Sequence, residues 1–358
     1  MNIVLESFDY IIVGQGIAGS CLAIRLLDIG KRILVIDQPE RNSSSRIAAG
    51  MFNPVTGQKM VRTWLADELF PTLHSFYRGV EQSTQSRCLY DVPLYRPFIS
   101  VEEQNEWMGR SVDPIYTNFI DQVFTSPNFA HVKNPYGGLL LKQCGYLDTR
   151  AFISAVSGRI RREGVLRHEH FDDARLSPIG DGVQYGEVNA KRIIFCQGVH
   201  ENRWFDWLPV RPLKGETISI QSPFREQVIL NRGVYILPSD SAGRQRIGST
   251  YNVQDKEAAI TLTARMELEE KASGLVDFSI QTVDHQWGWR PTSPDRRPML
   301  GAHPEQQSLI VFNGLGTKGI SLAPYFSLVL TRWMENHKPL NKEVDIERFK
   351  SLYWKSPK

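Results

Sequence analysis

Cysteine is scarce and widely spaced in this sequence. The four cysteines are Cys21, Cys88, Cys144 and Cys196, and no two of them form a CxxC pair. This spacing fits neither a zinc site of that type nor a dense disulfide framework. We therefore expect reduced thiols, as in a protein of the cytoplasm. The eight histidines include no HExxH pair, and we predict no metal site.

A strong net charge and a long apolar run are also absent. The chain has 42 basic and 39 acidic residues, and no basic patch is interleaved with aromatics, so nucleic acid is not an expected partner. The longest apolar stretch, residues 320–334, contains Pro324 and Arg332 and is shorter than the roughly 20 residues of a membrane span. Residues 1–9 lack the layout of a secretory signal. We expect a soluble protein without a membrane span.

The length and composition are those of a globular protein. At about 150 residues per domain, 358 residues correspond to about two domains. Hydrophobic residues make up 41% of the chain, which is enough for a sizeable core.

The first forty residues contain a complete strand, glycine turn, helix and strand unit. An apolar run over 8–13 precedes a GxGxxG turn over 14–19, and an apolar helix follows the turn. Gly30 is placed where a glycine ends a helix, and residues 32–37 predict a second buried strand. This arrangement predicts a dinucleotide-binding unit.

Each glycine of the turn has a physical reason to be there. Gly14 permits the tight turn, Gly16 lets the backbone approach a pyrophosphate, and Gly19 allows close packing of helix and strand. The helix begins near Ile17 and Ala18, and its free N–H groups favour phosphate oxygens.

Asp37 ends the second strand of the unit. A carboxylate at this distance from the turn accepts hydrogen bonds from the hydroxyls of an adenosine ribose and repels a 2′-phosphate. We predict that Asp37 and the adjacent Gln38 contact the adenosine part of a dinucleotide. Flavin and nicotinamide dinucleotides both use such a unit, and the later part of the chain must distinguish them.

Several later segments resemble those of FAD-dependent oxidoreductases. The fingerprint continues to Gly30 in its longer form, and further segments have the family's glycine, proline and arginine patterns in the family's order. These segments are residues 45–54, 191–198, 213–217, 247–250, 287–301 and 312–324. Together they resemble the D-amino-acid oxidase-like flavoproteins, the group that contains glycine oxidase, sarcosine oxidase and related amine dehydrogenases.

The resemblance implies bound FAD. Members that attach the flavin covalently use a C-terminal cysteine or an early histidine, but no cysteine follows Cys196 and no histidine precedes His74, so we predict noncovalent FAD. The residues predicted to contact the cofactor are Gly14, Gly16, Ile17, Ala18, Gly19, Asp37, Gln38, Ser45, Arg46, Ala49, Gly50, Met51, Phe171, Cys196, Gly198, Arg290, Gly314, Gly316, Thr317, Lys318 and Gly319.

The order of these segments predicts an α/β fold with two discontinuous domains. We expect a Rossmann-type FAD-binding domain and a second α+β substrate domain built on a mostly antiparallel sheet. The ranges 1–85, 145–211 and 286–358 hold the cofactor-like segments and are assigned to the first domain. The ranges 86–144 and 212–285 are assigned to the substrate domain, which is expected to cover the flavin.

Local patterns predict several elements of these domains. We expect a helix that begins at Asp148 and runs to Arg162, and a helix over 258–271. Alternation over 217–221 predicts a half-exposed strand, and the strands 234–238 and 245–249 are expected to form a hairpin through residues 239–244.

Arg290 is the predicted anchor for a substrate carboxylate. It occupies the position of the family's carboxylate-binding arginine, and a guanidinium binds a carboxylate with two parallel hydrogen bonds. Trp287 and Trp289 are expected to form an apolar wall beside it. The alternative is an arginine that pairs with Asp295 within a turn.

Three further residues are candidates for the reaction site. Lys318 lies in the late glycine turn, where its charge and the helix dipole would favour a reduced flavin and an anionic substrate. Exposure to solvent is the alternative for Lys318. Tyr235 and Tyr251 lie on predicted strands above the flavin and are candidates for contact with the substrate, although tyrosine is common in sheets.

The sequence thus indicates an FAD-dependent enzyme that oxidises the C–N bond of an amine or amino acid. The mechanism that the resemblance implies is transfer of a hydride from the substrate to flavin N5, followed by hydrolysis of the imine. The acceptor that reoxidises the flavin is O₂ or another compound. The alternatives are an oxidoreductase that acts on a modified tRNA base, a nicotinamide-dependent dehydrogenase, and an FAD-binding protein without turnover. The sequence indicates no oligomeric state.

Overall fold

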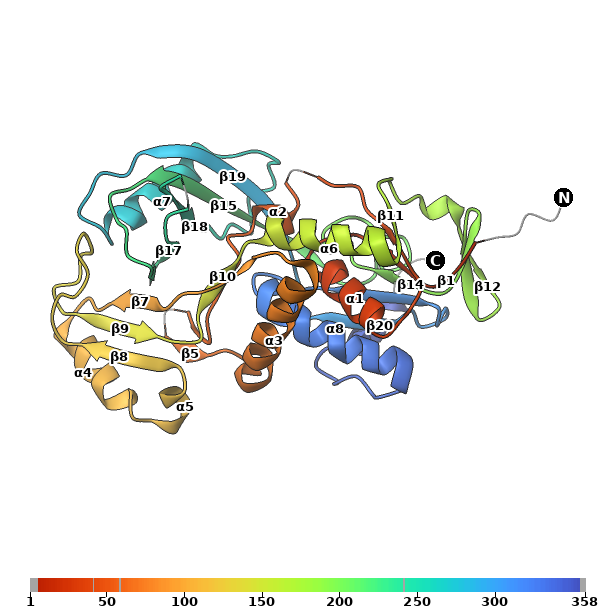
Figure 1. Cartoon of the computed structure of the whole chain (residues 1–358), viewed down its shortest axis with the longest axis horizontal. Coiled ribbons are helices and arrows are strands. Elements are labelled where there is room, and N and C mark those ends of the chain that lie inside the picture. Colours follow the sequence, from red (N-terminus) through yellow and green to blue (C-terminus); the bar gives the residue numbers. More distant parts are fainter. Residues whose placement is uncertain (1–5, 41, 58, 241, 355–358) are drawn as a thin grey trace.

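The computed structural model describes residues 6–40, 42–57, 59–240 and 242–354. Two eight-stranded sheets form the framework, one at each end of the elongated molecule (Figure 1). Two smaller sheets, β3-β10-β6 and β4-β5, connect the framework at its middle. The strands of these smaller sheets are β3 (Met51–Phe52), β4 (Val55–Thr56), β5 (Val61–Arg62), β6 (Leu89–Asp91) and β10 (Gly145–Leu147).

The first large sheet contains the predicted dinucleotide-binding unit. Its strands are β1 (Glu6–Val13), β2 (Ile33–Ile36), β11 (Val165–Arg167), β12 (Leu176–Ile179), β13 (Gly182–Tyr185), β14 (Val188–Phe195), β20 (Met299–Ala302) and β21 (Leu309–Asn313). The strands β11, β2, β1, β14 and β21 are parallel neighbours in this order, whereas β12, β13 and β20 are antiparallel additions. Because parallel strands end at one edge, the turns after β1, β2 and β14 meet there.

The second large sheet is mostly antiparallel, as predicted. Its strands are β7 (Leu94–Pro97), β8 (Ile120–Phe124), β9 (Gly138–Leu141), β15 (Arg211–Gln221), β16 (Ile229–Arg232), β17 (Val234–Ile236), β18 (Arg244–Gly248) and β19 (Thr282–Thr292). They follow the order β19-β15-β18-β17-β16-β7-β9-β8, with one parallel pair between β16 and β7. The predicted hairpin of β17 and β18 is confirmed; Ser241 in its loop lies outside the described residues.

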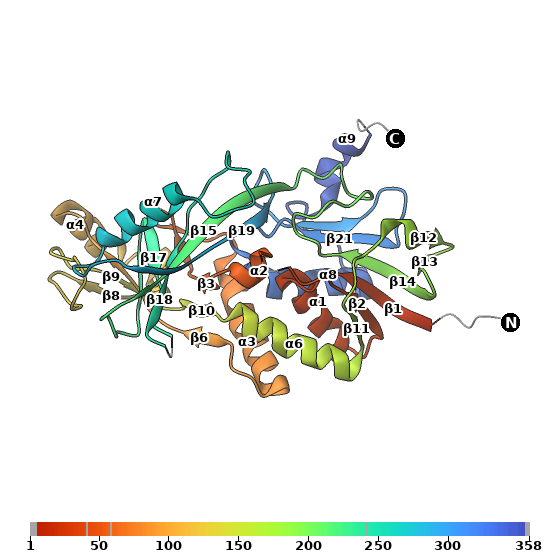
Figure 2. The same ribbon diagram turned by 90° about the horizontal axis from the view of Figure 1, so that it is seen from above.

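The helices cover the sheets and connect them. They are α1 (Ile17–Asp28), α2 (Ser44–Ile47), α3 (Ala66–Thr84), α4 (Val101–Arg110), α5 (Pro114–Thr117), α6 (Thr149–Glu163), α7 (Leu262–Ser273), α8 (Gly319–Asn336) and α9 (Lys350–Tyr353), with 3₁₀ helices η1 (Asp173–Arg175) and η2 (Ile346–Phe349). Helices α1, α3, α6 and α8 pack together beside the first sheet (Figures 1 and 2). Helix α7 packs on β15, β17 and β18.

Local signals place one helix correctly and another only in part. Helix α6 begins after Asp148, whose side chain accepts hydrogen bonds from two backbone N–H groups, as an N-cap does. Helix α7 begins at Leu262, so the prediction of a start at residue 258 is wrong. Thr261 is its N-cap, and the Thr261 N–H and hydroxyl both donate to the carboxylate of Glu216, which holds this residue outside the helix.

The prediction of a half-exposed strand over 217–221 is correct only at its end. Residues 213–218 of β15 are all buried. The strand is covered there, because α7 packs on it and the guanidinium of Arg290 lies against Gly215. Only Ser219 and Gln221 retain exposure.

The strands group in space largely as the proposed domains do, and the division itself remains a prediction. Strand β19 crosses one proposed boundary, because residues 286–292 belong to the second sheet although they were assigned to the first domain. Residues 1–5 and 355–358, at the ends of the assigned ranges, lie outside the described residues. None of the described helices has the length and apolar character needed to cross a membrane.

Candidate active site

The glycine turn after β1 is packed too closely for larger side chains. Gly14 has a φ of +96°, and a Cβ added to it would lie 2.6 Å from the carbonyl oxygen of Cys196. A Cβ on Gly19 would lie 1.9 Å from the carbonyl oxygen of Gly14. The turn therefore needs glycine at both positions for its own geometry.

The N-terminus of α1 contacts a hydroxyl oxygen, that of Ser45. The backbone N–H of Ile17 donates a 2.9 Å hydrogen bond to the hydroxyl of Ser45. A Cβ on Gly16 would lie 3.0 Å from the same oxygen. The three residues thus form a cradle in which the N–H of Ile17 faces an oxygen acceptor beside a residue without a side chain, and this fits a pyrophosphate.

Asp37 is fixed by the backbone of the same turn. Its Oδ1 accepts a 2.8 Å hydrogen bond from the N–H of Gln15. The buried Gln15 side chain is itself held by the carbonyl of Ile153 and the hydroxyl of Ser157. Within the described part of the chain, Asp37 Oδ2 makes no hydrogen bond, so one carboxylate oxygen is held in place and the other can accept a ribose hydroxyl.

A pocket joins these residues to the later segments. It brings together eight of the predicted cofactor residues from four separate parts of the chain: Gly16, Ile17, Ala18, Ser45, Cys196, Gly198, Gly316 and Gly319. Sequence analysis missed the other lining residues as individual contacts, although most of them lie within the quoted segments: Ser44, Pro291, Phe312, Asn313 and Leu315.

Hydrogen bonds hold the late glycine turn against this pocket. The side-chain amide of Asn313 donates a 2.7 Å bond to the carbonyl of Gly198, and the N–H of Gly316 donates a 2.8 Å bond to the carbonyl of Pro291. Gly198, Gly314 and Gly316 all have positive φ, which accounts for glycine in both turns.

The predicted contacts in the segment after α2 lie beyond this pocket, toward the second sheet. Met51 begins β3, and its sulfur is 4.0 Å from the side-chain amide of Asn231. A Cβ on Gly50 would lie 1.8 Å from the carbonyl oxygen of Leu147, so this turn also needs glycine. The carbonyl of Arg46, just before Ala49, accepts a bond from Arg150 that fixes the loop.

Two other predicted contacts have neighbours of their own. The ring of Phe171 is buried and stacks on Tyr185 at a centroid distance of 4.9 Å. The side chain of Gln38 lies 3.1 Å from a ring nitrogen of His170. Their roles toward the cofactor, like that of Thr317, remain predictions.

Arg290 of β19 reaches across β15 to the residues that follow β18. Its Nη2 donates a 2.7 Å bond to the hydroxyl of Ser249, and its Nη1 donates a 3.2 Å bond to the carbonyl of Thr250. The guanidinium lies over the ring of Tyr251, with its carbon 4.9 Å from the centroid. It also lies so close to Gly215 that a Cβ there would clash with it. Burial lowers the pKa of Arg290, as expected for a cation in an enclosed site.

The two tryptophans do not form the expected wall beside Arg290, and this prediction is wrong. Side chains alternate along a strand, so Trp287 and Trp289 point to the face of β19 opposite to Arg290. There the two rings pack edge to face with centroids 5.7 Å apart, and the ammonium group of Lys214 lies 5.9 Å from the Trp287 ring.

Lys214 belongs to a buried charged cluster on that opposite face. Its Nζ lies 2.7 Å from Asp255 and 3.3 Å from Glu216. Glu216 also contacts a ring nitrogen of His285 at 2.9 Å. The partners of Lys214 are thus protein carboxylates, and the cluster joins β15 to the segment before α7.

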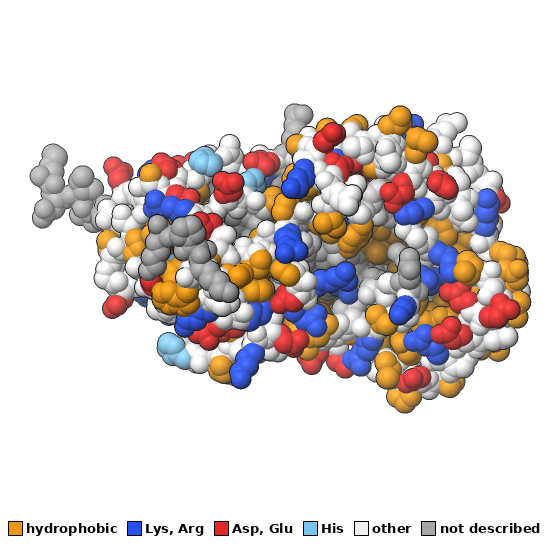
Figure 3. Space-filling model, turned by 180° about the vertical axis from the view of Figure 1, so that it is seen from behind, with side chains coloured by type: hydrophobic (Ala, Val, Ile, Leu, Met, Phe, Trp, Pro, Cys, Tyr) orange, Lys and Arg blue, Asp and Glu red, His pale blue; other side chains and the backbone are white. Residues whose placement is uncertain are grey.

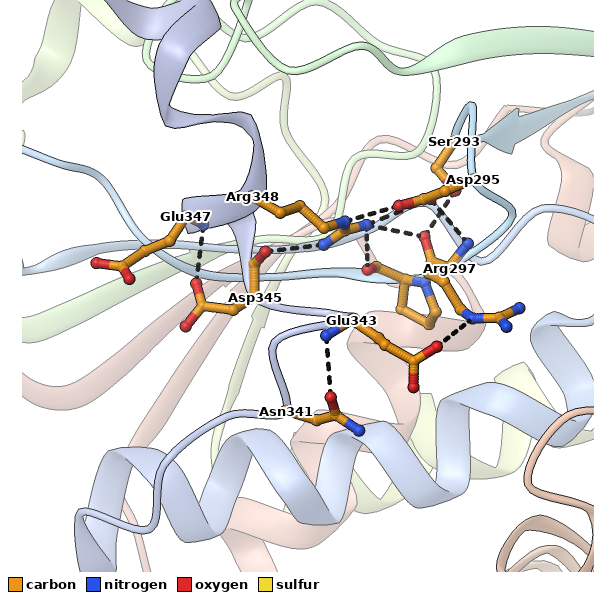
Figure 4. Close-up of polar contacts among 9 residues, drawn as sticks. Ser293, Asp295, Arg297, Asn341, Glu343, Asp345, Glu347 and Arg348 are labelled. Carbon is orange, nitrogen blue, oxygen red and sulfur yellow. Dashed lines mark hydrogen bonds and ion pairs between the residues drawn. The ribbon is translucent and has the colours of Figure 1, made fainter.

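The alternative pairing of Arg290 with Asp295 is not formed. Asp295 instead accepts a 2.8 Å bond from Arg348 of η2, and Arg297 pairs with Glu343 at 3.3 Å (Figure 4). These contacts attach the C-terminal segment to the turn after β19. Arg290 is therefore left without a carboxylate partner among residues 6–354 that the structure describes.

Tyr235 lies beside Arg290 on the same face of the second sheet. It pairs with Gly248 of β18, and a Cβ on that glycine would lie 2.4 Å from the Tyr235 hydroxyl. Burial raises the pKa of Tyr235 to about 12, against the opposing effect of the Arg290 and Arg246 charges. Tyr251 is more open, with 62% of its surface exposed.

Lys318 has its hydrogen-bond partners in and next to the β4-β5 pair. It precedes α8, and its Nζ donates to the hydroxyls of Thr56 and Thr63 at 3.1 and 3.2 Å. Burial and the nearby charges of Arg296 and Arg297 lower the pKa of Lys318 to about 8. The side chain is thus half-buried rather than solvent-exposed, and its catalytic role remains a prediction.

Sequence analysis missed Arg246 as a site residue. Its Nη1 lies 3.3 Å from the carbonyl oxygens of Ile47 and Ala48, which precede the predicted flavin contacts. The signal was present, because Arg246 is two residues before Gly248 in a predicted strand and therefore shares its face.

The surface around the middle of the molecule agrees with this charge distribution. The face in Figure 3 is hollowed there, and hydrophobic, Lys and Arg side chains lie around the hollow. In the portion of the chain that is described, no three His, Cys, Asp or Glu side chains gather in a way that would hold a metal ion.

The fold and the pocket together define a class of protein. A parallel sheet with a glycine cradle, a fixed acidic residue after its second strand and a second, mostly antiparallel sheet are the parts of a dinucleotide-binding oxidoreductase. The cradle, the turns that exclude side chains and the free Asp37 oxygen fit FAD.

Comparison with known proteins identifies the family. Residues 9–333 match the FAD dependent oxidoreductase family, so the chain belongs to this family. Glycine oxidase of Geobacillus kaustophilus (strain HTA426) is 31% identical over 355 residues, which cover 92% of this chain and 93% of the relative. The resemblance to the D-amino-acid oxidase-like group and the assignment of FAD are confirmed, and the chain is an FAD-dependent amine or amino-acid oxidoreductase.

Solved structures of related enzymes share the fold. The structure of glycine oxidase from Geobacillus kaustophilus has a TM-score of 0.76 at 20% identity and covers 96% of this chain and 98% of its own. Iminodiacetate oxidase from Chelativorans sp. BNC1 has a TM-score of 0.76 at 18% identity, with coverages of 95% and 98%. The predicted fold class is confirmed, and neither the tRNA nor the nicotinamide alternative is favoured.

Proposed function

We propose that the protein oxidises the C–N bond of an amino or imino acid whose carboxylate is bound by Arg290. The observation that carries this proposal is the environment of Arg290. The guanidinium is partly buried, held by Ser249 and Thr250, and has no carboxylate partner in the described ranges. A buried cation without an anion is costly, and an anionic ligand relieves that cost.

The position of Arg290 also sets the orientation of the substrate. A carboxylate that forms two parallel bonds with the guanidinium has its Cα held at a fixed distance and angle. The segment with Gly50 and Met51 lies across from the sheet that carries Tyr235, as the 4.0 Å contact between Met51 and Asn231 indicates. The substrate is thus proposed to lie between this segment and Tyr235.

The chemistry divides between cofactor and protein. Bound FAD supplies the hydride acceptor for this class of reaction. Arg290 binds and orients the carboxylate, while the buried face around Tyr235 limits access of water. The resulting imine is hydrolysed to a carbonyl compound and an amine or ammonia, and O₂ or another acceptor takes the electrons.

The named relatives support an amino or imino acid as the substrate class. Glycine oxidase and iminodiacetate oxidase, by their names, act on small molecules in which a carboxylate is close to the nitrogen. Arg290, which occupies the family's carboxylate-binding position in this chain, is consistent with such a substrate.

A substrate screen tests the proposal. The FAD-loaded protein is mixed without oxygen with a panel of amino and imino acids, and the visible flavin absorbance is followed. At least one member should bleach the flavin and yield a stoichiometric carbonyl product. If no amino or imino acid reduces a flavin that dithionite still reduces, the proposed function is wrong.

A further inference from the structure

A second arginine shares the proposed substrate space with Arg290. Arg246 lies two residues before Gly248 on β18, and Gly248 is paired with Tyr235 of β17. Residues two apart on a strand face the same side, so Arg246 and Tyr235 share one face of the sheet. The charges of both arginines also act on the phenol of Tyr235. Tyr235 is therefore close to two cations.

No acidic side chain within the described residues forms an ion pair with Arg246. Its Nη1 donates to the neutral carbonyl oxygens of Ile47 and Ala48, each at 3.3 Å. In the ranges that the structure describes, Nε and Nη2 of Arg246 make no hydrogen bond, and no carboxylate forms an ion pair with this residue. Arg290 likewise has only neutral hydrogen-bond partners. Among the residues that the structure describes, the two guanidinium groups thus have no carboxylate paired with either of them.

We propose that Arg246 determines specificity by binding a second carboxylate, so that the preferred substrates are dicarboxylic amino or imino acids. This inference rests on the proposed function, in which Arg290 binds the carboxylate next to the reacting nitrogen. Nε and Nη2 of Arg246 can each donate a hydrogen bond. Two such donors in one plane can bind both oxygens of a carboxylate. A monocarboxylic substrate leaves the second charge unpaired, and this difference generates selectivity.

Binding of unreactive acids tests the inference directly. Succinate and butyrate have the same four-carbon skeleton and differ in the second carboxylate. Each is titrated into the FAD-loaded protein, and the dissociation constant is read from the change in the flavin absorption spectrum. Because hydrogen bonds to a charged group are worth a factor of roughly 10 to 150 in affinity, succinate should bind at least about tenfold more tightly than butyrate.

Two variants and a control locate the effect. R246M should reduce the ratio of the two dissociation constants to near one, whereas R246K should retain part of it. R244Q is the matched control, because Arg244 is an exposed arginine on the same strand that pairs with Asp240 at 3.1 Å. R244Q should leave the ratio unchanged. FAD content is measured for each variant, so that loss of folding is recognised.

The outcomes separate this inference from the proposed function. Equal binding of succinate and butyrate to the wild-type protein, or a ratio that R246M leaves unchanged, overturns the inference even if monocarboxylic amino acids are oxidised. A large ratio that depends on Arg246 supports it even if no amino acid in the screen reduces the flavin. If R246M fails to bind FAD, the wild-type ratio and its partial retention in R246K decide the question.

Discussion

Individual residues of the cofactor site act through one or two atoms that the fold has placed. Asp37 illustrates this, since Oδ1 is engaged by the N–H of Gln15 and Oδ2 is available for a ribose hydroxyl. Sequence spacing predicted the ribose contact, but not the bond that fixes the carboxylate. The second oxygen is the one expected to bind the cofactor.

Replacement of Asp37 should weaken FAD binding. A hydrogen bond to a charged acceptor is worth about 1.5–3 kcal/mol, so D37A is expected to raise the dissociation constant of FAD by roughly 10- to 150-fold. Fluorescence titration of the protein with FAD measures this. E40A is the control, because Glu40 is an exposed acid in the next loop. Equal affinity of D37A and wild type would disprove the ribose assignment.

Lys318 should make stability depend on pH in the alkaline range. Its pKa is lowered to about 8 from an ordinary value of 10.5, so between these values the unfolded chain binds a proton that the folded chain does not. Stability therefore rises with pH over this interval. The free energy of unfolding of wild type relative to K318M should increase by up to about 1.4 kcal/mol per pH unit.

Denaturant titrations at several pH values measure this difference. K191M is the control, since Lys191 is exposed and paired with Asp9, which raises its pKa. The difference between wild type and K191M should stay level between neutral pH and the ordinary lysine pKa. If the difference in unfolding free energy between wild type and K318M also stayed constant with pH, the pKa of Lys318 would not be lowered in the folded protein.

At the scale of elements, the β1 turn and α1 depend on backbone contacts that tolerate no side chain. A Cβ on Gly19 would lie 1.9 Å from the carbonyl oxygen of Gly14, whereas one on Gly79 of α3 would meet nothing within 4 Å. The two glycines both lie in helices, and only the first is fixed by its surroundings.

This contrast predicts opposite effects of the same substitution. G19A should destabilise the protein and abolish tight FAD binding, because the turn must shift. G79A should stabilise the protein by about 0.5–1 kcal/mol, because alanine favours a helix over glycine. Thermal unfolding of the two variants measures both effects. A G19A variant that matches wild type in stability and FAD affinity would contradict the geometry of the turn.

Some features of the helices and strands could be predicted from the sequence, and others could not. The β1-α1-β2 unit and the N-cap Asp148 were predicted because their signals lie within a few residues. The face of Trp287 depends on the pairing of β19 with β15, and the start of α7 depends on Glu216, which is 45 residues away from Thr261. Such long-range contacts have no local signature.

For the whole molecule, two large sheets enclose a site that neither forms alone. The pocket is built from segments around residues 16, 45, 196, 291 and 316. The family and the FAD cofactor were evident from the order of these segments in the sequence. The position of Arg246 relative to Arg290 was not, since it depends on how β17, β18 and β19 come together.

FAD should be released intact when the whole protein is unfolded. All four cysteines are free and buried, and the prediction of noncovalent binding rests on the positions of cysteine and histidine in the sequence. Acid precipitation should leave the flavin in the supernatant. The amount of flavin there, read from its absorbance, should equal the molar amount of precipitated protein. Flavin that stays with the precipitate would show a covalent bond.

The central claim is that a carboxylate held by Arg290 positions the substrate for oxidation. The most direct measurement is the anaerobic rate of flavin reduction by one substrate from the screen and by the amine of the same skeleton without the carboxylate. The amino acid should reduce wild type far faster than the amine. R290M should lose about 2–4 kcal/mol of this advantage, a factor of roughly 30 to 1000. Equal rates with the two compounds, or an R290M variant as fast as wild type, would contradict the account.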